Sequence, residues 1–208
     1  SGEDCVYTGL AIAYFDGGYR LYAADFRHAR VDVFNEGFHL IRSGGFSDPH
    51  MPAGYAPFGI RAFGDKIVVT YALQNEKGDD AMDGVGNGFV DIYKTNGEFI
   101  RRFTSGGTLN APWGIETFVT RRTGDLNANL TLNSDRRTLL IGNFGDGSIN
   151  IYDGNGIFLG QMMNNGEAIR IDGLWAISYK PGAVDGRLYF TSGPTDEIHG
   201  LLGYIRMN

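Results

Sequence analysis

The chain of 208 residues has a single cysteine, Cys5, and only six prolines. One cysteine excludes an internal disulfide, so the fold rests on its core and its backbone hydrogen bonds. In a reducing compartment Cys5 is expected to be an inert thiol. In a secreted protein it predicts a partner cysteine on another chain or on a further segment.

Long apolar runs and positive charge are also scarce. No run approaches the roughly 18 residues of a membrane-spanning helix, so no transmembrane segment is predicted. The opening residues, Ser1 to Asp4, lack the basic and apolar regions of a signal peptide, although a processed secreted chain has the same appearance. The 18 Lys and Arg stand against 24 Asp and Glu, a net charge of -6. Binding to phosphates requires a basic surface, so nucleic acid is not an expected partner.

Glycine is abundant, with 32 residues, and aromatic residues make up 13% of the chain. Average glycine usage is about 7%, so this chain has roughly twice the usual share. The hydrophobic fraction of 42% and the charged fraction of 20% are those of an ordered chain. Glycine and aromatics in an ordered protein are typical of short strands joined by tight turns, and they predict an all-β fold.

Four segments of the chain repeat one order of features. Each opens with an apolar element, in which Ile12, Ile60, Ile115 and Ile177 recur at spacings of 48, 55 and 62 residues. Two further apolar runs follow in each segment, at 21–24 and 31–34, 67–70 and 90–93, 139–142 and 149–152, and 188–191 and 202–205. The first three segments add a fourth element, at 38–41, 99–103 and 158–162.

The local patterns identify these runs as antiparallel strands. The runs at 31–34, 90–93 and 149–152 alternate apolar and polar residues, which is typical of a strand with one buried face. Turns rich in Asn and Gly follow them and favour hairpins. No stretch of about 10 to 15 residues keeps a helical period, so crossover helices are not expected.

A repeat of this length and order predicts a β-propeller of four-stranded antiparallel blades. We expect about four blades in one propeller domain, over residues 1–50, 51–108, 109–168 and 169–208. Four blades can close a ring by themselves. No fourth strand follows Ile205 and none precedes Gly9, however, so we expect part of a larger ring, or open edges that something else covers.

Several longer strings fall in one order: YAPFGI at 55–60, GNGFVD at 86–91, LNAPWG at 109–114, GNFGDG at 142–147, IDGLW at 171–175 and FTSGPTDEIHGL at 190–201. In these strings the chain resembles an uncharacterised, conserved hypothetical family of bacterial β-propellers, some of whose members carry PEP-CTERM sorting tails. The resemblance implies a six-bladed, NHL-like propeller of which this chain holds roughly the last four blades. It implies no activity. The chain departs from the family in its missing front third and in an insert at 121–137.

The richest polar cluster lies in the glycine-rich segment 77–88, which contains Asp79, Asp80, Asp83 and Asn87. Three carboxylates and an amide offer the oxygen ligands that Ca²⁺ prefers. Asp79, Asp83 and Asn87 fall at every fourth position, which is not the spacing of an EF-hand. The alternative interpretation is a solvated loop whose Asp and Gly residues form turns.

A second polar set lies after the second strands or just before an opening strand: Asp25, Asn143, Asp146, Asp172, Asp196, Glu197 and His199. In propellers, loops at such positions converge on the central channel, where they can hold a calcium ion or a substrate. Alternatively, the Asp and Asn side chains cap blade turns through local hydrogen bonds. The chain has no Gly-x-Ser-x-Gly, His-Glu-x-x-His or Cys-x-x-Cys motif.

The insert at 121–137 is polar and irregular, which predicts a surface excursion. It contains Asn129, the only N-glycosylation acceptor of the chain. In a secreted eukaryotic protein Asn129 would carry a glycan.

Two functions are compatible with these features. The favoured hypothesis is a non-enzymatic propeller at an extracellular or cell-surface location, a structural or interaction module. It would assemble with copies of itself, or with a partner chain or segment that completes the ring. The alternative is a calcium-dependent hydrolase or lactonase of the six-bladed kind, with Asp25, Asn143, Asp172 and His199 around a Ca²⁺ ion in the channel.

Overall fold

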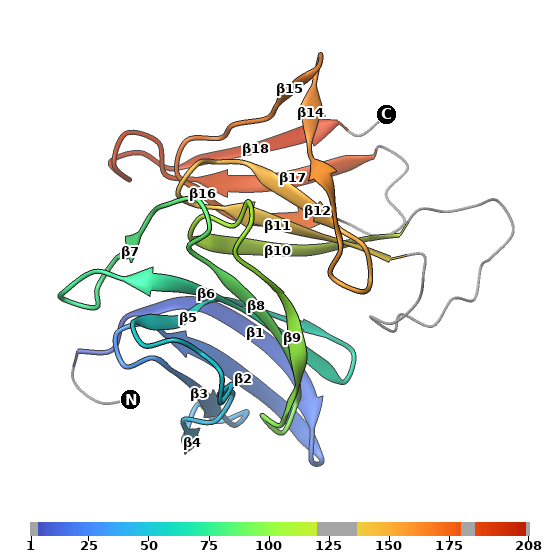
Figure 1. The fold of residues 1–208 in the computed structure, drawn as a ribbon. Coiled ribbons are helices and arrows are strands. Elements are labelled where there is room, and N and C mark those ends of the chain that lie inside the picture. Colours follow the sequence, from blue (N-terminus) through green and yellow to red (C-terminus); the bar gives the residue numbers. More distant parts are fainter. Residues whose placement is uncertain (1–3, 120–136, 180–185, 207–208) are drawn as a thin grey trace, which may run out of the picture. The chain divides into compact units, whose positions relative to one another are not determined.

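The computed structural model describes residues 4–119, 137–179 and 186–206, and these ranges contain strands and turns but no helix (Figure 1). They therefore hold no helix that could cross a membrane. The chain forms two compact units, Ser1–Pro112 and Trp113–Asn208. Asn129 and the insert around it lie outside the described residues, so the glycosylation site stays a prediction.

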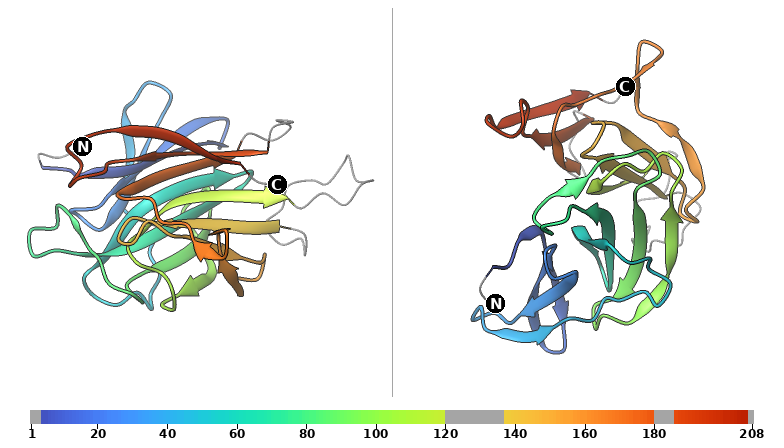
Figure 2. Two further views of the ribbon diagram at one scale, coloured as in Figure 1. Left: turned by 90° about the horizontal axis from the view of Figure 1, so that it is seen from above. Right: turned by 60° about the vertical axis from the view of Figure 1, so that its left-hand side comes forward.

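The first unit contains two antiparallel sheets (Figures 1 and 2). The first has the order β1-β2-β3-β4, with strands Tyr7–Phe15, Gly18–Asp25, Arg30–Phe34 and Leu40–Ser43. The second has the order β5-β6-β8-β9, with strands Tyr55–Phe63, Lys66–Gln74, Phe89–Lys94 and Phe99–Ser105. A short strand, β7 (Ala81–Met82), lies in the segment predicted to be a loop and pairs with the end of β6.

The second unit contains a four-stranded and a three-stranded antiparallel sheet. The order of the third sheet is β10-β11-β12-β13, with strands Pro112–Val119, Arg137–Asn143, Ile149–Tyr152 and Phe158–Gln161. A small hairpin follows, β14 (Met163–Asn164) with β15 (Glu167–Ala168). The fourth sheet, β16-β17-β18, has strands Leu174–Tyr179, Arg187–Ser192 and Leu201–Arg206. The prediction of an all-β propeller with about four antiparallel blades is confirmed, and a six-bladed ring stays a prediction.

Side chains of Asn and Asp shape the turns between the third and fourth strands of the first three sheets. Asn35 Oδ1 accepts hydrogen bonds from the amides of Gly37 and His39, at 3.0 and 2.9 Å. Asn96 and Asp153 accept equivalent bonds at 2.8 to 3.0 Å. These local bonds let a short polar segment reverse the chain, which explains why the hairpins recur with the same residue types.

The strand register corrects the alignment of the opening strands. The second strands can be aligned on the residue that pairs with the last apolar residue of the third strand. This residue is Leu21 in the first sheet, Ile67 in the second and Leu188 in the fourth. The residue two positions after each of these residues pairs with the opening strand of its sheet. Its partners there are Leu10, Ile60 and Ile177, which are therefore equivalent. The expected equivalence of Ile12 with Ile60 was therefore wrong by two residues. A shift of two keeps a side chain on the same face of a strand, so the repeat pattern was still visible.

Each sheet has two faces that pack differently. Face A is the side of the first sheet that carries Ala11, Tyr22 and Val33, and face B is the opposite side, which carries Leu10 and Leu21. Equivalent positions in the strand register define the two faces of the other sheets.

Face A of one sheet packs on face B of the next in both units. In the first unit one buried cluster joins Ala11, Tyr22 and Val33 to Ile60, Ile67 and Val69. In the second unit a corresponding cluster joins Leu140 and Ile149 to Ile177 and Leu188. Burial of these apolar faces is the main stabilisation of each pair of sheets.

Candidate functional site

A polar residue is buried at the same place in the third strand of the first three sheets. Asp32, Asp91 and Asn150 are all fully buried, and each pairs with the third residue of the apolar run on the second strand. Toward the outer strand they pair with Ser43, Arg102 and Gln161. A buried polar side chain requires hydrogen bonds, so each sheet has a polar network at this position.

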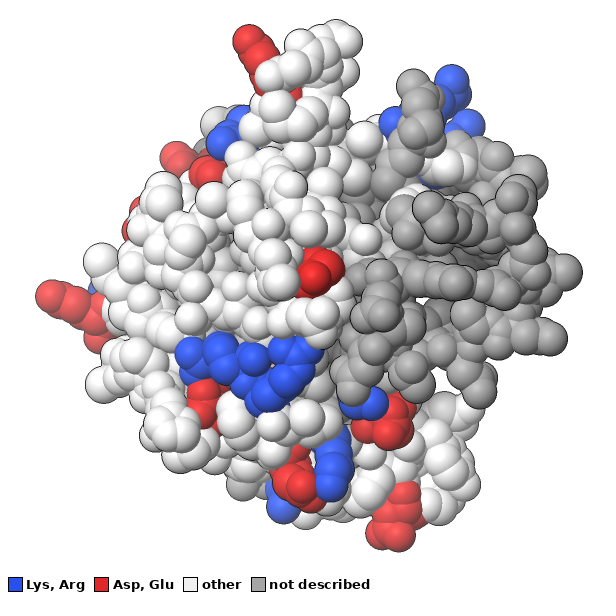
Figure 3. Space-filling view, turned by 45° about the vertical axis from the view of Figure 1, so that its right-hand side comes forward, with Lys and Arg blue, Asp and Glu red and all other residues white. Residues whose placement is uncertain are grey.

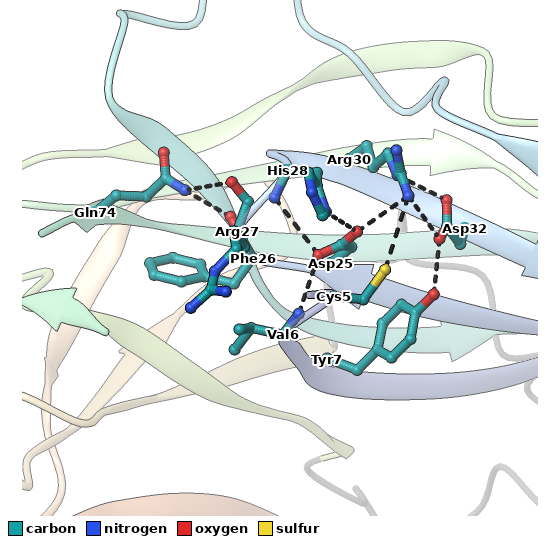
Figure 4. A network of polar contacts seen from close by, with 10 residues as sticks. All are labelled: Cys5, Val6, Tyr7, Asp25, Phe26, Arg27, His28, Arg30, Asp32 and Gln74. Atoms are coloured by element: carbon teal, nitrogen blue, oxygen red, sulfur yellow. Dashed lines mark hydrogen bonds and ion pairs between the residues drawn. The ribbon is translucent and has the colours of Figure 1, made fainter. Parts of the chain in front are cut away.

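In the first sheet the network contains two buried carboxylates (Figure 4). Arg30 lies between them, with Nε 3.0 Å from Asp32 Oδ1 and Nη2 3.3 Å from Asp25 Oδ2. The hydroxyl of Tyr7 donates to Asp32 Oδ2 at 2.8 Å. Desolvation acts to lower the pKa of Arg30, but the neighbouring Asp32 and Asp25 outweigh it and raise that pKa. Burial and the Asp32 carboxylate raise the pKa of Tyr7. Arg30 therefore stays charged and offsets the cost of burying both carboxylates.

Asp25, the predicted channel residue of the first sheet, has further partners at the sheet end. Its Oδ1 accepts the amide of Val6 at 3.2 Å, and its Oδ2 lies 2.7 Å from His28 Nδ1. The Sγ of Cys5 is 3.9 Å from Arg30 Nη2. Within the described residues, Cys5, Asp25 and His28 are the only three His, Cys or carboxylate side chains whose ligand atoms all lie within 4.8 Å of one another.

The second sheet has a related network around Arg102. Its guanidinium forms ion pairs with Asp91 and with Asp48, and it lies over the ring of Phe89, 4.4 Å from the centroid. Burial raises the pKa of Asp91 to about 6, although Arg102 works in the opposite direction. Burial also disfavours the ionised form of Asp48, but the amide of His50 and the charge of Arg102 outweigh it and lower its pKa.

Two tyrosines extend this second network into the core. The hydroxyl of Tyr93 lies 3.3 Å from Asp91 Oδ2 and 2.6 Å from the hydroxyl of Tyr71. Tyr71 donates to the backbone carbonyl of Phe46 at 2.8 Å. Burial raises the pKa of both tyrosines, so both stay protonated as hydrogen-bond donors.

In the third sheet amides replace the charged groups. Gln161 Nε2 donates to Asn150 Oδ1 at 3.0 Å and to Ser148 Oγ at 3.1 Å. Ser148 Oγ in turn donates to Asp146 Oδ1 at 2.7 Å, and Asn143 Nδ2 donates to the same oxygen at 3.2 Å. The structure thus brings together two predicted channel residues, Asn143 and Asp146, in bonds that hold a turn.

The remaining predicted channel residues lie around the loop that follows β17. Asp172 Oδ2 accepts the amide of Thr195 at 3.1 Å, and Glu197 Oε1 accepts the indole N–H of Trp175 at 2.6 Å. Asp196 and His199 are exposed in the same loop. Asp25 belongs to the first unit and these residues to the second, and each unit is described by itself. The predicted channel site and its calcium-dependent hydrolysis stay predictions.

The acidic loop predicted to bind calcium has local partners. Asp79 accepts a bond from Asn75 Nδ2 at 2.9 Å and lies 3.6 Å from Arg27 Nη2. Asp80 accepts the amide of Ala81 at 2.7 Å, and Asn87 Nδ2 donates to the backbone carbonyl of Asp83 at 3.5 Å. Calcium binding by Asp79, Asp80, Asp83 and Asn87 stays a prediction.

Sequence reasoning missed the buried networks of Asp32 and Asp91. Each aspartate stands between two apolar residues of a third strand, a pattern that indicates a solvent-facing position in a sheet with one exposed face. Face A of the first sheet covers the face of the second sheet that carries Asp91, so this polar position is buried as well. In the first sheet Arg30 and Tyr7 contact the carboxylate of Asp32. A signal was present, because Val-Asp-Val, Val-Asp-Ile and Ile-Asn-Ile recur at one position of the repeat.

One apolar face of the first unit is open. Leu10, Ile12, Tyr14 and Tyr19 on face B of the first sheet are between 58% and 63% exposed. A groove of about 400 Å³ borders this face and is lined by Leu10, Ile12 and Leu21 of face B, by Ala11, and by Arg61 and Ala62 of β5. On the side of the molecule shown in Figure 3, basic and acidic groups lie near one another, and uncharged side chains cover most of the described surface.

Comparison with known proteins finds relatives without an assigned function. The chain is 35% identical to the uncharacterized protein R648 of Acanthamoeba polyphaga mimivirus, over 99% of this chain and 49% of that protein. It is 33% identical to the uncharacterized protein L690 of the same virus, over 99% of this chain and 52% of that protein. The chain therefore spans about half the length of these curated relatives. No family model matches it.

Solved structures show the fold alone. Hydrazine synthase of Kuenenia stuttgartiensis matches with a TM-score of 0.54 at 17% identity, over 97% of this chain and 51% of that chain. A nidogen/laminin complex matches with a TM-score of 0.51 at 15% identity, over 97% of this chain and 76% of that chain. The bacterial family, its sorting tails and the number of blades in a complete ring stay predictions. The chain is a propeller similar in sequence to uncharacterised viral proteins.

Proposed function

We propose that this chain is a non-enzymatic interaction module at an extracellular or cell-surface location, and that face B of its first sheet binds a propeller blade of a second copy. The observation that carries the proposal is the exposure of Leu10. It is 63% exposed, whereas the equivalent residues Ile60 and Ile177 are 6% and 1% exposed. Those two residues are buried because face A of the preceding sheet covers them.

The chain also carries the complementary surface. On face A of the fourth sheet, Leu202 and Tyr204 are 73% and 48% exposed. Their equivalents in the first sheet, Val31 and Val33, are buried at the contact with the second sheet. Face A of the fourth sheet therefore presents apolar side chains at the positions through which face A packs on face B in the other sheets. Such a head-to-tail contact uses two different surfaces of the chain.

Burial of the exposed apolar side chains on the two faces favours association. Burying one Leu or Ile side chain contributes about 1.5–3 kcal/mol, and Leu10 and Ile12 on face B and Leu202 on face A are exposed. The charged side chains of this face, Asp25, Arg30 and Asp32, pair with one another at one end of it, and Arg61 borders the groove. The longer relatives have room for further blades, which would cover the same face from within one polypeptide. Such a blade would compete with a second copy of the chain for face B of the first sheet.

The test is the oligomeric state of the 208-residue chain in sedimentation velocity over a wide concentration range. We expect reversible self-association that Leu10→Asp and Leu202→Asp each weaken at least about tenfold. The control is Val85→Asp, which changes a side chain that is 78% exposed elsewhere in the first unit. The two weakened variants should form a dimer when mixed, because each still has the surface that the other lacks.

A chain that stays monomeric at all concentrations would exclude a second copy as the occupant. Association that both variants leave unchanged would exclude these two faces. Thermal melts should show all three variants folded, since each substitution is at an exposed position. Surface labelling of cells that express the chain tests the extracellular location, and labelling only after lysis would contradict it.

A further inference from the structure

We propose that Cys5, Asp25 and His28 form a binding site for one zinc ion, or for another divalent cation of similar softness. The three side chains come from the segment before β1, the end of β2 and the turn after it (Figure 4). The site lies at one end of face B, where Asp25 shares the face with Leu21, but it uses none of the apolar side chains on which the proposed function rests.

The positions of the ligand atoms fit such an ion. Cys5 Sγ, a carboxylate oxygen of Asp25 and a ring nitrogen of His28 lie within 4.8 Å of one another. Tetrahedral zinc has bonds of about 2.0–2.3 Å, which place neighbouring ligand atoms roughly 3–4 Å apart. Side-chain rotation is therefore enough to bring the three atoms onto one ion. The side chain of His28 is 36% exposed, which gives the ion a path from solvent and leaves a fourth position for water.

The ligand types select the kind of metal. Thiolate and imidazole prefer zinc and similar ions, whereas calcium takes oxygen ligands only. The sequence suggested Asp25 as a calcium ligand. Its actual neighbours, a cysteine and a histidine, favour zinc instead.

The charges of the network can accommodate the ion. Arg30 now contacts Asp25, at 3.3 Å, but it also has Asp32, at 3.0 Å, and can keep this second partner when Asp25 turns to the metal. The thiol of Cys5 gives its proton to solvent, and His28 binds in its neutral form. A thiolate and a carboxylate then balance the charge of the ion, and Asp32 balances Arg30.

The second sheet supplies a matched control. His50 Nδ1 lies 3.3 Å from Asp48 Oδ1, and Asp48 pairs with Arg102, so the group repeats the histidine, carboxylate and arginine of the first sheet. His50 and Asp48 do not belong to a three-ligand group among the described residues. Replacing His50 therefore removes a histidine beside a buried aspartate without touching the proposed site.

The experiment is a titration of the reduced chain with Co²⁺, which reports thiolate ligation by a charge-transfer band in the near ultraviolet, followed by displacement with Zn²⁺. We expect one ion per chain, protection of Cys5 from a thiol reagent by Zn²⁺, and no change on His50→Ala. Cys5→Ser should abolish the band, and His28→Ala should weaken binding at least about tenfold.

Two results would overturn the proposal. One is the absence of a thiolate band at millimolar Co²⁺. The other is binding that Cys5→Ser and His28→Ala leave unchanged. Melting curves of each variant accompany the titration. If His28→Ala is unfolded, His28→Gln replaces it, and zinc protection of the thiol in the unchanged chain gives an independent readout.

Discussion

Asp91 on β8 lies directly opposite Arg102 on β9, and the carboxylate of Asp91 is bonded to Nε of Arg102. Asp91 is fully buried, and Arg102 is shared with Asp48. The attraction between the charges does not cancel the cost of desolvation, because burial still raises the pKa of Asp91 to about 6. Folding therefore makes the carboxyl of Asp91 harder to ionise than it is in the unfolded chain.

This arrangement predicts that part of the stability is lost as the pH rises from about 4 to about 6. The folded chain binds the Asp91 proton more tightly than the unfolded chain, whose Asp pKa is about 3.9. The contribution of protonated Asp91 to the free energy of unfolding is complete below pH 4 and amounts to at most about 3 kcal/mol. Urea unfolding at pH 4, 5, 6 and 7 measures it, and Asp91→Asn should flatten the decline. Asp48, whose pKa is lowered, contributes a dependence of opposite sign only at lower pH. An equal slope in the variant would contradict the assignment.

Asn150 and Gln161 take the positions of Asp91 and Arg102 in the third sheet. Asn150→Asp places a buried carboxylate opposite an amide, and we expect the free energy of unfolding to fall by about 2–4 kcal/mol at pH 7. The double variant with Gln161→Arg should recover part of this loss, because it recreates the pair of the second sheet. A double-mutant cycle measures the coupling. Additive effects of the two substitutions would show that the positions are not energetically equivalent.

The sequence predicts the strands well because two local signals agree there. Alternating runs such as Val90 to Tyr93 indicate the strand, and the Asn-Gly turns that follow indicate the hairpin. The exact pairing of the opening strands is set by β-bulges, such as the register shift between Pro57 and Ile60, and a sequence repeat does not reveal them. The polar sites depend on contacts between distant residues. Asp25 was recognised from its place in the repeat, but Cys5 reaches it only because the chain before β1 runs along the end of β2.

Tyr71 links the second network to the segment after β4, and Tyr71→Phe tests this link. Its hydroxyl serves both the carbonyl of Phe46 and the hydroxyl of Tyr93, which are buried and would lose a partner. We expect the variant to be destabilised by about 1–3 kcal/mol in thermal or urea unfolding. Tyr14→Phe is the control, because Tyr14 is 62% exposed. Equal stability of the two variants would mean that water replaces the lost bonds.

Gly147 fixes the approach of two loops in the second unit. Its φ is +66°, and a Cβ atom there would overlap the backbone of Ile171, whose amide donates to the Gly147 carbonyl at 2.9 Å. Gly166, in the same unit, also has a positive φ, +88°, but has open space around it. Gly166→Ala should therefore cost only about 1 kcal/mol, the conformational penalty, whereas Gly147→Ala should cost clearly more. The difference between the two in urea unfolding measures the contribution of the close approach. If the two losses are equal, the loops can separate without cost, and the turn of Asn143 and Asp146 does not depend on that contact.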